Sequence, residues 1–211
     1  MRGIAGLSNR SVQLAVRQTV RHDIARLTST FAAPAPVACA LLLGVACSTA
    51  RSLTDGVVLG ALAGVCATVP ATLYIERQLR RGGPRRQYLQ RRSERLTPIA
   101  IACASVLLAG GLVRAVEPSR DLECVLLTML FVLCLTLAAT PISRVSVHMA
   151  AVTGTSVILQ FLFGPIGVAL LPVVAMVGWS RLELGEHTTA QVVTGAVLGA
   201  IGAIAAYSVV G

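Results

Sequence analysis

The sequence predicts an all-α integral membrane protein, a helical bundle of six to seven transmembrane helices with an N-terminal amphipathic arm. Its 211 residues are 55% hydrophobic and only 13% charged, whereas a soluble domain carries about 25% charged residues. The apolar residues also gather in seven segments, most of them near the roughly 20 residues that a spanning helix needs. These segments are residues 31–50, 55–75, 97–116, 122–140, 147–163, 165–180 and 188–210.

Residues 1–30 form the predicted arm, and residues 31–211 form one membrane domain. Apolar and charged side chains alternate at helical spacing between residues 11 and 27, which suits an amphipathic helix on a membrane surface. The same composition also fits a disordered basic arm. Five arginines precede the first apolar run, so we expect no cleavable signal peptide. The apolar stripe comprises Val12, Ala15, Val16, Val20, Ile24 and Leu27, with Arg17, Arg21 and Arg26 off it.

The later segments carry packing signals. The fifth and sixth segments are the shortest, and Gly164-Pro165 between them is typical of a tight helical hairpin. The last segment holds Gly195, Gly199 and Gly202 at near i, i+4 spacing, which favours close helix packing. The six cysteines lie in apolar stretches without a CxxC pair, and we interpret them as small packing residues.

The charges are distributed unevenly between the two faces. If all seven segments cross the membrane, the polar stretches 77–95, 141–148 and 180–187 share one face with the arm. All 18 basic residues are arginines and the net charge is +9, which suits anionic lipid or a phosphorylated substrate better than nucleic acid. The positive-inside rule makes this face cytoplasmic, unless arginines kept for substrate bias the count. Acids that mark span limits lie on the other face, at Asp55, Glu117, Asp121 and Glu123.

Three fragments supply the polar chemistry of the arginine-rich face: RRSERLTP (91–98), SRVSVHMA (143–150) and SRLELGEHTTAQ (180–191). A phosphate ester needs its oxygens neutralised, and arginine does this bidentately. Arg181 and Arg95 are the candidates. Two histidines can divide the remaining work, since one can attack phosphorus while the other protonates the leaving oxygen.

Together the fragments resemble the three signature motifs of the type 2 phosphatidic acid phosphatase superfamily, over about residue 85 to the C-terminus. The third motif is Ser-Arg, five residues, His, three residues, Asp. Ser180, Arg181 and His187 match it, and Gln191 stands where Asp is usual. The second motif is Pro-Ser-Gly-His, and the stretch VSVH (145–148) keeps its Ser and His.

The first motif of that superfamily is Lys, six residues, Arg-Pro. Arg95, with Pro98 three positions on, matches it best. Tyr88 stands where the Lys would be, so Arg91 or Arg92 is the alternative basic residue. The form SVH…HTTAQVV is also similar to a branch of small, arginine-rich bacterial members.

The resemblance implies a metal-independent hydrolase of the cell membrane that needs no cofactor. Its substrate would be a lipid phosphate or diphosphate, isoprenoid or glycerolipid. By the resemblance, His187 is the nucleophile that forms a phosphohistidine and His148 is the general acid. Whether copies associate as a homo-oligomer is left open. The implied substrate-binding residues are Arg181, Arg95, Arg92, Arg91, Ser146 and Ser180.

Gln191 is the main departure from the family pattern. It follows His187 by one helical turn, so the two side chains can meet. An Asp would hold the histidine tautomer and stabilise the imidazolium, whereas a Gln carbonyl holds the tautomer without charge. Glu183 or Glu186 could supply the missing charge. His187 also falls at the start of the last helix, where N–H groups and the dipole favour phosphate, with Thr188 or Thr189 as the cap.

Three other functions compete with a phosphatase. A degenerate family member acting as a lipid-binding or interaction protein would explain the lost motif residues. A magnesium-dependent phosphotransferase would need clustered carboxylates, yet the chain has nine acids and no Asp-rich motif. A transporter would need a buried charge along a span, and the apolar segments offer none.

Overall fold

The computed structural model describes residues 9–82 and 92–210, without the side chains of residues 9–16, 81–82 and 92–95. In this part of the chain helices are joined by short turns and no strand occurs, which confirms the all-α class. The described part of the predicted arm is itself a helix. The helices are α1 (Asn9–Phe31), α2 (Pro34–Thr49), α3 (Leu53–Gly82), α5 (Arg92–Val116), α6 (Arg120–Ala139), α7 (Val147–Phe163), α8 (Pro165–Ala169), α9 (Leu171–Glu183) and α10 (Thr189–Val210).

The number of candidate spans is lower than the sequence predicts. Among the described residues, α3, α5, α6, α10 and the leg made of α8 and α9 are long and apolar enough to cross a membrane. α1 and α2 add a sixth only as one span bent by 51°. The first and fifth apolar segments do form helices, but with 16 and 17 residues they fall short. The expected six to seven spans are therefore five to six, because α2 begins only at Pro34 and the fifth segment, which ends at Gly164 as predicted, is too short to be counted.

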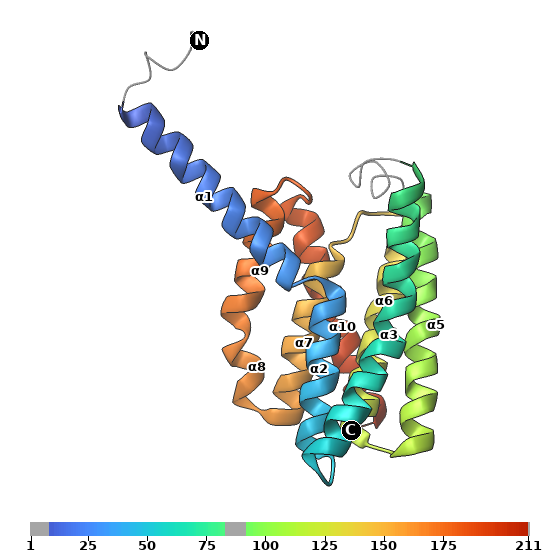
Figure 1. Ribbon diagram of the computed structural model, residues 1–211. Helices are drawn as coiled ribbons and strands as arrows, with labels where there is room; N and C mark the ends of the chain where they lie inside the picture. The colour runs from blue at the N-terminus through green and yellow to red at the C-terminus, as the bar shows by residue number, and fades with distance from the viewer. Residues whose placement is uncertain (1–8, 83–91, 211) are drawn as a thin grey trace.

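The described parts of the polar stretches that were predicted to share one face lie at one end of the bundle (Figure 1). That end carries α1, the last turns of α3, the first turns of α5, and the α6–α7 and α9–α10 loops. The other end carries the α2–α3 and α5–α6 turns, the α7–α8 hairpin and the end of α10. The alternation of the helices therefore gathers both motif histidines at the same end.

The acids at the other end bind arginines or lie beside them, as expected for the limits of spans. Arg114 Nε lies 3.5 Å from Glu123 Oε1, joining the end of α5 to the start of α6. Arg120 Nε donates to the carbonyl oxygen of Val210 at 3.0 Å and so anchors the end of α10. These contacts are exposed and contribute little to stability, but they place the charges outside the apolar layer.

The glycines of α10 bring its backbone against α7 and α6, and the predicted close packing is confirmed. A Cβ at Gly195 would lie 2.5 Å from the carbonyl oxygen of Ser146. At Gly199 it would lie 2.3 Å from the carbonyl oxygen of Ala150, one turn further along both helices. Neither backbone oxygen can move aside, so only glycine permits this approach.

We expect Gly199→Ala to lower the free energy of unfolding in detergent by about 1–3 kcal/mol, the usual cost of overpacking. Gly111→Ala is the matched control, because Gly111 is exposed on α5 and a Cβ there meets nothing within 4 Å. The control should be neutral or more stable by up to about 1 kcal/mol, since alanine is the better helix former. Thermal or SDS denaturation measures both variants. Equal losses in the two would show that α10 does not pack this closely.

The α7–α8 hairpin returns the chain to the site end. Gly164 adopts φ +63°, which ends α7, and Pro165 opens α8 as the sequence predicts. Ser156 Oγ donates to the carbonyl oxygen of Gly167 at 2.7 Å. A Cβ at Gly167 would lie 2.4 Å from the Ser156 carbonyl oxygen. This tight contact fixes how α8 and α9 lie along α7, and so fixes the relative positions of their far ends.

Candidate functional site

A small apolar cluster joins four elements directly beneath the motif residues. It comprises Ala32, at the α1–α2 turn, Met149 and Val152 of α7, Val177 of α9 and Val192 of α10. Met149 follows His148, Val192 follows Gln191, and Val177 lies one turn before Arg181. Hydrophobic burial at these positions therefore brings the starts of α7 and α10 and the end of α9 together.

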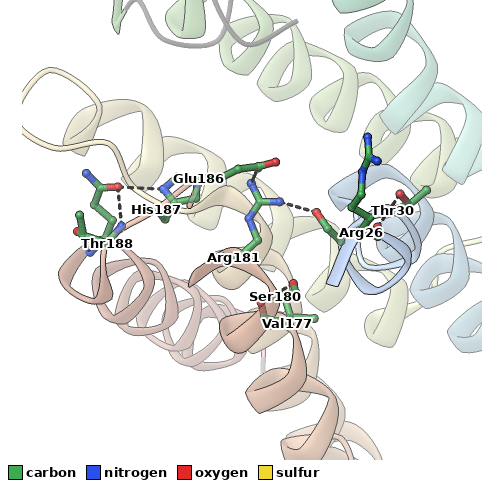
Figure 2. Close-up of polar contacts among 10 residues, drawn as sticks. Arg26, Thr30, Val177, Ser180, Arg181, Glu186, His187 and Thr188 are labelled. Atoms are coloured by element: carbon green, nitrogen blue, oxygen red, sulfur yellow. Dashed lines mark hydrogen bonds and ion pairs between the residues drawn. The ribbon is translucent and has the colours of Figure 1, made fainter. Parts of the chain in front are cut away.

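The α9–α10 loop folds His187 back toward the end of α9. The N–H groups of Glu186 and His187 both donate to the carbonyl oxygen of Arg181, at 3.2 and 3.4 Å. Gly185 makes this turn with φ +62°, a conformation that side chains with a Cβ rarely adopt. The last turn of α9 and the short loop after it therefore present the arginine and the histidine of the third motif together (Figure 2).

Arg181 is the most deeply placed charge of the site. The residue is only 5% exposed. One of its terminal nitrogens, Nη2, binds the carboxylate of Glu186, and the other, Nη1, donates to Ser29 Oγ of α1. Nε is buried and has no hydrogen-bond partner among the described residues. A guanidinium held on two sides with a third donor unused can still bind one more acceptor.

Gln191 holds His187 by one oxygen. His187 Nδ1 lies 3.1 Å from Gln191 Oε1, and the N–H of Thr188 donates to the same oxygen at 3.3 Å. In return the N–H of Gln191 donates to Thr188 Oγ1 at 3.4 Å, which completes a capping box and makes Thr188 the cap. With this atom of Gln191 assigned as the oxygen that accepts from the Thr188 N–H, the matching tautomer of neutral His187 carries its proton on Nδ1. The lone pair of His187 is then on Nε2.

The start of α7 lies against the first turns of α10. The N–H of Ser146 donates to the carbonyl oxygen of Gln191 at 3.3 Å, and Gly195 makes room for this approach. Ser146 is fully buried, and its Oγ has no hydrogen-bond partner among the described residues. His148 is half-buried in the first turn of α7. The second and third motifs thus meet through backbone contact.

Of the remaining predicted site residues, Ser180 and the backbone of Arg92 and Arg95 are described. Ser180 is buried and its Oγ donates to the Val177 carbonyl at 2.8 Å, within its own helix. Arg92 and Arg95 lie in the first turns of α5 at the same end, but α5 packs mainly on α3 and α6. Their side chains, and the whole of Arg91, lie outside the described residues.

Sequence reasoning missed the contribution of α1. Ser29 accepts from Arg181, and Arg21 Nη2 binds Glu183 Oε2 at 2.9 Å. Ala25, one helical turn from both Arg21 and Ser29, is completely buried. Arg21, Ala25 and Ser29 follow i, i+4, i+8 spacing, so one face of α1 with a basic residue and two small ones was the available signal. Glu183 and Glu186, considered as partners for His187, bind Arg21 and Arg181.

Comparison with known protein families, with curated proteins and with solved structures finds no match. The residues that the structure describes contain no group of three His, Cys, Asp or Glu side chains arranged to hold a metal ion.

Proposed function

We propose that the protein is a multi-pass phosphatase of the cell membrane. It hydrolyses a lipid phosphate or diphosphate, isoprenoid or glycerolipid, through a phosphohistidine. The observation that carries the proposal is the α9–α10 loop. It sets Arg181, buried with an unused Nε–H, beside His187, whose Nδ1 is bound to Gln191.

The first step of the proposed reaction uses both histidines. The Nε2 lone pair of His187 attacks phosphorus, and the bond from phosphorus to the lipid oxygen breaks. The leaving oxygen takes a proton from His148. In the second step water attacks phosphorus, the P–N bond breaks and His148 takes the proton from water. Inorganic phosphate is released and both rings return to their starting states.

The arginine supplies the charge that this reaction needs. Phosphoryl oxygens gain most from a guanidinium fork in a site shielded from water. In the structure the Glu186 carboxylate accepts from Nη2. A phosphoryl group would accept from the unused Nε and displace Glu186 from Nη2, so one anion replaces another. Glu186 is partly exposed and can be solvated after displacement.

Phosphate release from purified protein tests the proposal. The wild type, in detergent with EDTA, is offered phosphatidate, an isoprenoid monophosphate and an isoprenoid diphosphate. We expect release from at least one of them, together with an acid-labile phosphoenzyme. Release that requires added magnesium would overturn the metal-independent mechanism and favour a phosphotransferase-like site.

A lipid-binding protein is the second candidate, and two observations favour it. Gln191 brings no negative charge to His187, and Ser29 and Glu186 already occupy both terminal nitrogens of Arg181. A degenerate member of the family would bind a lipid phosphate without cleaving it. Saturable binding with no phosphate release from any of the three substrates would decide for this candidate.

The role of Gln191 gives a graded prediction. Gln191→Leu removes the acceptor of the His187 Nδ1–H, so we expect turnover to fall by about 10–100-fold. Gln191→Asp keeps an oxygen there and adds charge, so its turnover should stay near or above that of the wild type. Initial rates of phosphate release measure both. Thr188→Ala is the control, because it removes the helix cap at a cost of about 1 kcal/mol but leaves Gln191 in place. Equal rates for Leu and Asp would disprove the orienting role.

A further inference from the structure

The helix α1 has two faces, and only one is covered. Its packed face carries the buried Ala25 together with Arg21 and Ser29, which bind Glu183 and Arg181 in the last turn of α9. The other face carries a stripe of four large apolar side chains that are 43–76% exposed. They follow one another at intervals of four, three and four residues, the spacing of a single helical stripe. The exposed stripe consists of Val20, Ile24, Leu27 and Phe31.

Two observations indicate what covers this stripe. Only two residues separate the end of α1 at Phe31 from the start of α2 at Pro34. α2 is apolar, and the two helices together make the candidate sixth span, so Phe31 lies within one turn of an apolar helix. Exposed Arg17 and Arg26 also lie on α1. Asp23 is its one described acid, so the arginines give the helix a net positive charge. Apolar residues with arginines beside them are the pattern that binds anionic headgroups.

We propose that α1 binds the headgroup region of an anionic bilayer through Val20, Ile24, Leu27 and Phe31. This inference goes beyond the proposed function, since it assigns a second lipid contact away from the candidate site. A membrane fits the stripe because α1 leads directly into the apolar helix α2, with which it makes the candidate sixth span. The apolar side chains enter the acyl boundary, and Arg17 and Arg26 meet lipid phosphates.

The two faces couple the bilayer to the site. A helix seated on lipid by one face holds Ser29 against Arg181 and Arg21 against Glu183 by the other. This consequence rests on the proposed function. α1 is then one wall of the phosphate site, and its position depends on the lipid surface. Phosphate release should therefore be faster in anionic vesicles than in zwitterionic ones.

Tryptophan fluorescence tests the membrane contact without any use of phosphatase activity. Trp179 is the only native tryptophan, so Ile24→Trp and His22→Trp are made in a Trp179→Phe background. His22 is exposed on α1 but off the stripe, which makes it the matched control. In vesicles of phosphatidylglycerol with brominated acyl chains, we expect emission at shorter wavelength and about twofold more quenching at position 24 than at 22. Phosphatidylcholine vesicles should reduce this difference.

If Trp179→Phe lowers the yield of folded protein, the same two variants are made with Trp179 retained and its spectrum subtracted. Equal emission and quenching at positions 24 and 22 would overturn the proposal. So would a shift at position 24 that grows with protein concentration in unbrominated lipid, because the stripe would then pair with a second copy. Since the readout is optical, lack of phosphate release would refute the proposed function and leave the lipid contact standing.

Discussion

The His187→Ala variant should lose at least about 10³-fold in phosphate release, the scale on which removal of a nucleophile acts. The ring Nε2 is the atom that would bond to phosphorus, and water alone would have to replace it. No phosphoenzyme should form. Release is measured in EDTA with the lipid phosphate that the wild type cleaves best. His187 lies in a loop, so the variant should keep the bundle, and its thermal midpoint checks this.

Substrates with different leaving groups distinguish the roles of the two motif histidines. His148→Ala lacks the proton donor, so it should be slow on a lipid phosphate, whose alkoxide leaves poorly. On para-nitrophenyl phosphate, whose phenolate leaves without a proton, it should regain much of its rate of phosphoenzyme formation, measured as the initial burst of para-nitrophenolate. His187→Ala should be inactive on both substrates. His22→Ala, at the third histidine, is the control and should match the wild type. Phosphate release that survives His187→Ala would reject the assigned nucleophile.

The second large effect is expected at Arg181. Arg181→Met should lower kcat/KM by about 10²–10³-fold, because it removes the buried charge that faces the phosphoryl oxygens. Arg181→Lys keeps the charge but loses the fork, and the unpaired Nε with it, so about a tenfold loss should remain. Kinetics with the same lipid phosphate measure both variants.

Arg114→Met is the matched control for loss of one arginine. Arg114 lies at the opposite end of the bundle, 75% exposed, in contact with Glu123. Its replacement should leave kcat/KM unchanged and stability within about 1 kcal/mol. If Arg114→Met and Arg181→Met slow the reaction equally, the arginines act through the net charge of the protein and the site has been misplaced.

Local features of the site could be predicted from the sequence because they depend on short spacings. Gln191 was expected to meet His187 because it follows by four residues, and the contact forms because Gln191, in the first turn of α10, reaches back over the cap to the residue before it. The bounds of α7 also agree with the fifth apolar segment, because Gly164 ends the helix and a polar loop precedes it. Hydropathy also located α2, α3, α5, α6 and α10, whereas the single segment 165–180 forms two helices, α8 and α9.

What lay beyond prediction depends on tertiary packing. Ser29 and Arg181 are 152 residues apart, and no periodicity records which face of α1 meets which loop. α3 continues to Gly82, seven residues past its apolar segment. The arginines and leucine there have high helix propensity, so the helix does not need an apolar environment to continue. The first motif stays a prediction, since the side chains that would test it are outside the described residues.

The shortness of α7 has a consequence for how a lipid would reach the site. Its 17 residues rise about 25 Å, while the hydrocarbon of a bilayer is about 30 Å thick. Such a mismatch is relieved by local thinning of the bilayer or by leaving the helix end below headgroup level. Where the bilayer thins, a lipid beside α7 would have its phosphate at the depth of Ser146 and His148, which form the start of that helix. The substrate could then enter sideways and never leave its leaflet.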